Sequence, residues 1–139
     1  MTTPPRPVAA PVSVSVQVGR DARQVHEYVR DPRNLPRWAP AFARSVRRDG
    51  DRWLVETADG TVEVAFAADN PDGVADHRIT GDGVDVLVPL RVHPDGTGAR
   101  VTLTLQAAAG ASEEEVARDV ALVRSDLEML KRVLEAPSG

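Results

Sequence analysis

The sequence predicts an α+β fold in which seven antiparallel strands form one curved sheet around a long C-terminal helix. Three observations support this prediction. An alternating strand begins the folded part of the chain, five Asp-Gly pairs divide its middle into short segments, and an amphipathic pattern covers residues 112–135. Asp-Gly between alternating apolar runs indicates a hairpin, and an apolar period of about 3.6 residues indicates a helix.

The composition limits the possible partners and the compartment. The chain has 139 residues, 42% of them apolar and 27% charged, with a net charge of −4, which is typical of a single soluble domain. Because nucleic-acid binding needs a concentrated basic surface, the negative charge and the scattered arginines argue against that class of partner. The absence of cysteine excludes disulfides and thiol catalysis and favours a cytoplasmic location.

The N-terminal residues are predicted to lie outside the fold. The segment "MTTPPRPVAAP", residues 1–11, contains four prolines and no apolar run. It therefore lacks the pattern of a signal peptide or a membrane span, and no membrane partner is expected. Residues 1–10 are predicted to be a disordered tail, and residues 11–136 a single domain.

One strand and two short helices are predicted next. Residues 12–18 alternate valine with polar side chains, which indicates a strand buried on one face. Asp21 is a suitable N-cap, and Gln24 completes the capping-box pattern of a first helix that Pro32 limits. The stretch "NLPRWAPAF", residues 34–42, is predicted to be a second, irregular helical piece, because its prolines suit only a first helical turn.

The middle of the chain is predicted to hold six strands joined by five turns. The Asp-Gly pairs fall at residues 49–50, 59–60, 72–73, 82–83 and 95–96. Pro89, inside the run "VDVLVPLRV", leaves two orientations open for Arg91. An unbroken alternation from Val84 turns Arg91 outward, whereas a bulge at Pro89 turns it inward.

The last element is predicted to be a helix gripped by the sheet. Ser112 and Glu115 form a capping box. Its apolar positions step by three and four and cover about half of the helix circumference: Val116, Val120, Leu122, Val123, Leu127, Met129, Leu130, Val133 and Leu134. Because a flat partner would leave part of so wide a face wet, a curved sheet is expected.

This order of elements carries a resemblance to a known superfamily. The segments "VSVSVQVGRDARQVHEYVRDPRNLPRWAPAF", "VPLRVHPDGTGARVTLTL" and "DLEMLKRVLE" resemble the START/Bet v 1 (SRPBCC) superfamily, and within it the polyketide cyclase/dehydrase-like group. The resemblance spans residues 12–135 and implies a helix-grip fold with a ligand cavity between the sheet and the C-terminal helix. It implies no single function, because the superfamily holds carriers, cyclases and receptors.

Two titratable residues are the candidate catalytic groups. In "ADHRIT", His77 shares a strand face with Ala75 and Ile79, which predicts an inward position for a general acid or base; a histidine hydrogen-bonded within the wall is the alternative. Asp126 falls near the middle of the helix's apolar arc, where a carboxylate needs a basic or donor partner from the sheet or the short helices. The pair is interpreted either as a structural ion pair that fixes the helix on the sheet or as the polar end of the pocket, which orients a ligand carbonyl or hydroxyl. The candidate partners are His77, Arg78, Arg91 and Arg37.

The other candidate site residues form the expected cavity wall. The predicted ligand-binding residues are Trp38, Phe42, Trp53, Val64, Phe66, Ile79, Val86, Val88, Arg91, Leu103, Val123, Leu127 and Leu130. Trp38 is interpreted either as a wedge that closes the core or as a wall or lid of the cavity. His26 is expected to pack and His93 to be exposed. Because the histidines lack metal-ligand spacing and no nucleotide motif occurs, no metal or cofactor is expected.

Three classes of function remain open from the sequence. The first is a protein that binds a small, mostly apolar molecule as a monomer or homodimer. The second is a polyketide cyclase or aromatase that uses acid–base groups in the same cavity. The third is a protein-interaction module, for which a collapsed cavity and an exposed apolar patch are expected.

Overall fold

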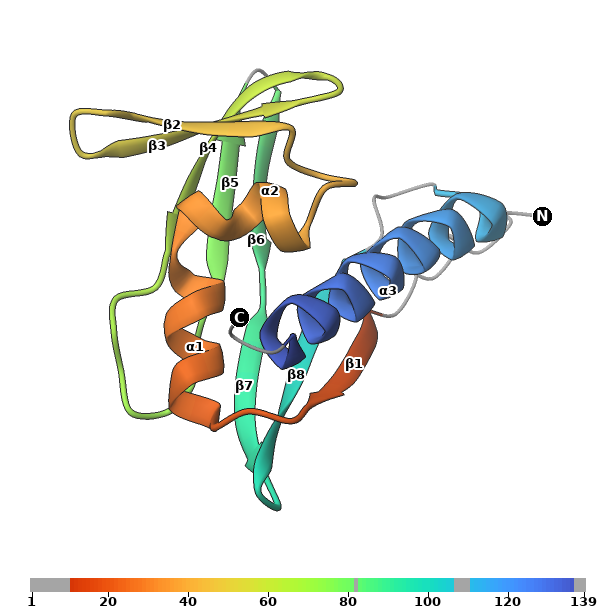
Figure 1. Ribbon diagram of the computed structural model, residues 1–139. Helices are drawn as coiled ribbons and strands as arrows, with labels where there is room; N and C mark the ends of the chain where they lie inside the picture. The colour runs from red at the N-terminus through yellow and green to blue at the C-terminus, as the bar shows by residue number, and fades with distance from the viewer. Residues whose placement is uncertain (1–10, 82, 107–110, 137–139) are drawn as a thin grey trace.

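The computed structural model describes residues 11–81, 83–106 and 111–136, and the predicted tail at residues 1–10 lies outside them. Figure 1 shows helices packed against antiparallel strands. In chain order the elements are β1 (Val12–Val18), α1 (Ala22–Arg30), the 3-10 helix η1 (Pro32–Asn34), α2 (Leu35–Trp38), β2 (Ser45–Asp49), β3 (Arg52–Thr57), β4 (Gly60–Phe66), β5 (His77–Gly81), β6 (Val84–Val88), β7 (Leu90–Asp95), β8 (Gly98–Leu105) and α3 (Glu113–Glu135).

The strands form two sheets, with orders β1-β8-β7 and β2-β3-β4-β5-β6. The α+β class and the C-terminal helix are as predicted, but the single seven-stranded sheet is wrong. Pro89 divides the run predicted as one strand, so that β6 pairs with β5 and β7 pairs with β8. Proline has no amide hydrogen to donate to a ladder, although its carbonyl still accepts from the Thr104 amide at 2.9 Å.

The break at Pro89 does not reverse the alternation of side chains. Leu90 and Val92 are buried, whereas Arg91 is exposed. The inward interpretation of Arg91 is therefore wrong, because its neighbours on both sides occupy the core face. Its guanidinium lies on the outer face, where Nε donates to Asp76 Oδ1 at 2.8 Å.

Three of the Asp-Gly pairs, at residues 49–50, 59–60 and 95–96, lie at tight turns between paired strands as predicted. Asp72 and Gly73 lie in the longer connection between β4 and β5, which packs against β7. The Val92 amide donates to the Gly73 carbonyl at 2.8 Å, and a Cβ on Gly73 would overlap the Val92 carbonyl oxygen. This glycine is thus needed for a close approach to β7 as well as for its φ of +74°.

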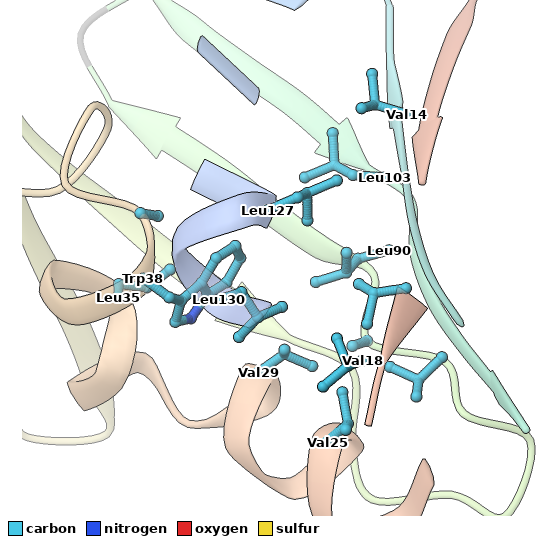
Figure 2. Close-up of a cluster of buried hydrophobic side chains, with 14 of the residues drawn as sticks. Val14, Val18, Val25, Val29, Leu35, Trp38, Leu90, Leu103, Leu127 and Leu130 are labelled. Carbon is cyan, nitrogen blue, oxygen red and sulfur yellow. The ribbon is translucent and has the colours of Figure 1, made fainter. Parts of the chain in front are cut away.

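The core lies where the helices meet the sheets. α1 packs against β7 and β8, and α3 packs mainly against β1, α2 and β8. Figure 2 shows side chains from all of these regions converging in one cluster, including Val14, Val18, Val25, Val29, Leu35, Trp38, Leu90, Leu103, Leu127 and Leu130. The apolar face of α3 is therefore held by strands on one side and by the α2 segment, residues 35–42, on the other. Leu122 lies outside this grip and is 47% exposed, so the buried face is narrower than predicted.

Candidate ligand-binding cavity

A cavity of about 150 Å³ lies between α3, the α2 segment and the ends of β5, β6 and β8. Ten of its twelve lining residues are apolar, and the two polar ones are His77 and Asp126. The lining residues are Leu35, Trp38, Ala39, Phe42, His77, Ile79, Val88, Leu103, Leu105, Val123, Asp126 and Leu127. This arrangement gives an apolar hollow with a small polar part, as is usual for sites that hold small organic molecules.

Most of the wall was predicted from the sequence, but three lining residues were not named. Leu35 and Ala39 flank Trp38 in the α2 segment, and Leu105 follows Leu103 on the same face of β8. The signal for Leu105 was available, because residues two apart in a strand share a face. Leu35 and Ala39 could be placed only by the way in which α2 packs on α3.

Several predicted ligand-binding residues lie away from the cavity. Val64 and Leu130 are fully buried in the core. Trp53 is half-buried, with the Arg48 guanidinium 5.7 Å from its ring centroid. Val86 is 47% exposed, because α3 packs mainly on β1, α2 and β8 and the start of β6 extends away from it (Figure 1). Phe66, beside the His77 ring, and Arg91, on the outer face, are also outside the lining.

His77 is the first polar group of the cavity. It begins β5 and is 5% exposed, and its ring lies beside that of Phe66, with the centroids 4.6 Å apart. Its Nδ1 lies 3.3 Å from the Ala75 carbonyl oxygen; since a carbonyl can only accept, Nδ1 carries the hydrogen in this contact. Burial lowers the pKa of His77, so the ring is neutral at neutral pH and Nε2 is its acceptor atom.

The neighbour of His77 explains how the ring is turned inward. Asp76 Oδ1 accepts from the Leu90 amide at 3.0 Å and from Arg91 Nε at 2.8 Å. The Arg91 guanidinium holds the pKa of the Asp76 carboxyl below its usual range. Because successive side chains of an extended chain point to opposite faces, anchoring Asp76 outside directs His77 to the cavity.

Asp126 is the second polar group, and it meets a donor from the region of the short helices as predicted, although this donor is a backbone amide and not one of the four side chains named. The donor that it meets is the Ala41 backbone amide, at 3.4 Å from Oδ1, in the segment after α2. Burial raises the pKa of Asp126 to about 6. Across the described ranges, no cationic group lies within 4.0 Å of its carboxylate.

The four side chains proposed as partners of Asp126 do not fill that role. Arg78 forms a bidentate pair with Asp85 on the outer face, and Arg91 pairs with Asp76. His77 contacts Ala75 instead, and Arg37 is exposed on α2. The correction has a simple cause, since strand alternation places both sheet arginines on the face opposite the cavity.

Trp38 combines the two interpretations that the sequence left open. It is 2% exposed and belongs to the core cluster, and it also lines the cavity. Its indole Nε1 is buried without a hydrogen-bond partner among the described residues. An unpaired buried donor is costly, so this N–H group lowers the stability that Trp38 contributes to the core.

His26 lies in a separate hollow and has a structural contact. Its ring is buried, and Nε2 lies 2.9 Å from the Val74 carbonyl oxygen. This contact fixes the connection between β4 and β5 against α1. The packing role expected for His26 agrees with this position, and His93 is exposed as expected.

The comparisons with known proteins decide the family. The model of the family described as polyketide cyclase/dehydrase and lipid transport matches residues 9–135. The chain belongs to this family. The resemblance to the START/Bet v 1 superfamily is thereby confirmed, and the helix-grip description applies to the arrangement of α3 and the sheets. The comparison with curated protein sequences gives no match.

Solved structures of other proteins share the fold of this chain at low sequence identity. The Aha1 dimer from Colwellia psychrerythraea has a TM-score of 0.73 at 11% identity, covering 94% of this chain and 99% of that one. Ara h 8.0201 has a TM-score of 0.64 at 14% identity, covering 92% and 99%. DynU16, a protein in the dynemicin biosynthetic locus, has a TM-score of 0.67 at 24% identity, covering 91% of this chain and 47% of its own. These similarities establish the fold.

None of the helices within residues 11–81, 83–106 and 111–136 is long and apolar enough to cross a bilayer.

Proposed function

We propose that the protein binds a small, mostly apolar molecule in the cavity between α3 and the sheets. The observation that supports this proposal is a hollow of about 150 Å³ with ten apolar lining residues and two polar ones. An apolar cavity of about this volume in another protein accommodates benzene. The cavity as it stands therefore suits a ligand with one ring and small substituents.

The rim of the cavity sets the limit on larger ligands. Phe42 and Val123 are half-buried lining residues on facing elements, the α2 segment and α3. Drug-sized ligands occupy about 300–1,000 Å³, so a multi-ring ligand requires these side chains to move apart. His77 and Asp126 supply the polar contacts that orient a ligand carbonyl or hydroxyl.

Mass spectrometry and one matched pair of variants test the proposal. Native mass spectrometry of freshly purified protein is expected to reveal a retained small molecule. Val123→Phe fills the cavity from its wall and is expected to lose that molecule, whereas Leu122→Phe places the same aromatic side chain at an exposed neighbour and keeps it. If the wild type retains nothing and binds no single-ring apolar compound in solution, the proposal fails.

A second candidate function is a polyketide cyclase or aromatase-type enzyme. The observation that favours it is the presence of two titratable groups in one apolar cavity, a neutral His77 and Asp126 with a pKa of about 6. Acid–base groups that titrate near neutral pH are suited to proton transfer. His77 would act as the base through Nε2, and Asp126 would exchange a proton with the ligand's oxygen.

Deuterium exchange separates the enzyme from the binding protein. The retained molecule, or a polyketide-like β-carbonyl compound, is incubated with the protein in deuterated buffer and analysed by mass spectrometry. An enzyme of this type is expected to accelerate exchange at carbon next to the carbonyl, and His77→Gln is expected to remove the acceleration. Binding without accelerated exchange would leave the first proposal standing and reject the second.

A further inference from the structure

The Asp126 carboxylate faces an apolar cavity without a positive charge beside it. α2, which packs against α3, carries Arg37, and this side chain is exposed. β1, the other main neighbour of α3, contains no charged residue. From β5, His77 lines the cavity in its neutral form. β8, which also packs against α3, carries Arg100, which is exposed and pairs with Asp95 at 3.4 Å. Within the described part of the chain, these neighbours therefore leave the charge of Asp126 uncompensated.

The single hydrogen bond to Asp126 is also weak support for a half-buried carboxylate. A carboxylate can accept about four hydrogen bonds, and the Ala41 amide, at 3.4 Å, is a long donor. Burying a charge is costly unless it is paired and hydrogen-bonded. A ligand that brings its own cation and several N–H donors would relieve this cost.

We propose that the ligand is a small organic cation, an amine attached to one ring or a short apolar chain, whose ammonium group donates hydrogen bonds to the Asp126 carboxylate. This inference rests on the proposed binding function and specifies the chemical class of its ligand. Charge-assisted hydrogen bonds are about twice as strong as neutral ones. An amine is accordingly preferred over an alcohol of the same shape, and a carboxylic acid is repelled.

The rest of the wall is compatible with such a ligand. Trp38 and Phe42 contribute aromatic rings, which attract organic cations through their π-electrons. Nε2 of His77 is a second hydrogen-bond acceptor, because its Nδ1 already donates to Ala75. The apolar remainder, formed by residues such as Leu103 and Leu127, suits the ring or chain of the amine.

The affinity for an amine should depend on pH in a defined direction. A bound cation favours the ionised form of Asp126 and lowers its pKa below the value of about 6 in the free protein. Below that pH the carboxyl is protonated in the free protein, so amine affinity falls by up to about tenfold per pH unit. Protonation of His77 at still lower pH repels the cation and acts in the same direction. An alkylammonium stays charged throughout, since its pKa is about 10.

The test uses three probes of one shape: benzylamine, benzyl alcohol and benzoate. Each is titrated into isotopically labelled protein at pH 7.5 and pH 5, and dissociation constants are taken from amide and methyl chemical shifts. At pH 7.5 benzylamine is expected to bind at least about tenfold more tightly than benzyl alcohol, and benzoate is expected not to bind. At pH 5 the preference for the amine is expected to fall, with the alcohol unchanged.

Two variants test whether the preference for the amine comes from the Asp126 carboxylate. Asp126→Asn keeps the shape of the side chain and is expected to abolish or reverse the preference for the amine, because the ammonium then has no counter-charge in the cavity. Asp119→Asn removes the same charge from an exposed position on the same helix and is expected to keep the preference. Equal wild-type affinities for amine and alcohol would overturn the inference and leave the binding proposal intact. Binding of none of the probes would also overturn it, and the retained-ligand experiment would then decide the binding proposal separately.

Discussion

Two carboxylates of α3, one at its C-terminal end and one near its middle, have opposite surroundings. At the end of the helix, Glu135 Oε2 accepts from the Gly19 amide at 2.7 Å and from Lys131 Nζ at 2.8 Å. Nearer the middle of the helix, the Asp126 carboxylate accepts from one amide at 3.4 Å. The Lys131 ammonium lowers the pKa of Glu135, whereas burial raises the pKa of Asp126 to about 6.

The difference indicates which carboxylate is structural. Glu135 joins the end of α3 to the chain after β1, and Arg20 strengthens the same joint through Nη2, which donates to the Ala136 carbonyl at 3.2 Å. Such contacts satisfy the last carbonyls of a helix. Asp126 joins little, and its placement in the cavity costs folding free energy. This cost agrees with the ligand-binding role that we propose for Asp126.

The largest expected effect is the loss of stability caused by a core substitution in α3, between Asp126 and Glu135. Leu130 is fully buried and outside the cavity lining, and Leu127 is buried but lines the cavity. Leu130→Ala should lower the free energy of unfolding by about 2–5 kcal/mol. Leu127→Ala should cost less, because one side of this side chain already faces a hollow. Urea denaturation measures both, and a larger loss for Leu127→Ala would mean that the cavity is filled in solution.

The next effect is a gain of stability from Asp126→Asn. The folded-state pKa of about 6 exceeds the unfolded value of about 3.9, so the native state binds the extra proton between these values. Stability of the wild type therefore falls as pH rises from about 4 to about 6. After allowance for solvent screening of a half-buried group, the variant should gain on the order of 1–2 kcal/mol at pH 7.

The pH dependence is the control for this gain. Urea denaturation of both proteins should show that the gain shrinks as pH falls from about 6 to about 4 and approaches zero below about pH 3, where the wild-type carboxyl is protonated in both states. A gain that does not change with pH would show that the substitution acts through packing and not through charge.

His77 should show the opposite pH dependence. Burial lowers the pKa of its ring below the ordinary value of 6.5, so the unfolded chain binds the proton first as pH falls. The stability that a neutral His77 contributes is present above pH 6.5 and is lost as pH falls below it. His77→Gln should therefore flatten the stability profile below pH 6.5. An unchanged profile would show that the ring is solvated and protonated in the native state.

The smallest expected effect is that of Glu135→Gln. Glu135 and Lys131 are solvent-accessible, and exposed ion pairs contribute little. The variant should lower the melting temperature slightly, and this loss should decrease in high salt because ions screen the pair. Asp126→Asn should show no such loss. If Glu135→Gln were the more disruptive of the two substitutions, the assignment of structural and functional carboxylates would need to be reversed.

Local patterns in the sequence were sufficient for the elements and for much of the cavity wall. The alternation of valines predicted β1, and Ser112 caps α3 as expected, accepting from the Glu115 amide at 3.1 Å. Period-two alternation also predicted that His77 points inward, and the helical period placed Asp126 on the face that meets the α2 segment. These predictions depend on residues a few positions apart, where backbone geometry alone fixes the direction of a side chain.

Contacts between distant segments decided the rest. The Ala41 amide that meets Asp126 lies 85 residues away in the chain, so no local pattern predicts it. The break at Pro89 divides the sheet because β6 and β7 find different partners in β5 and β8. Whether an apolar strand position becomes core, cavity wall or exposed surface depends on which element covers it. On the same face of β6, Val88 lines the cavity, whereas Val86 is exposed. The sequence by itself determined which way the side chains point, and the tertiary structure determined what they meet, because packing partners are set by the whole chain.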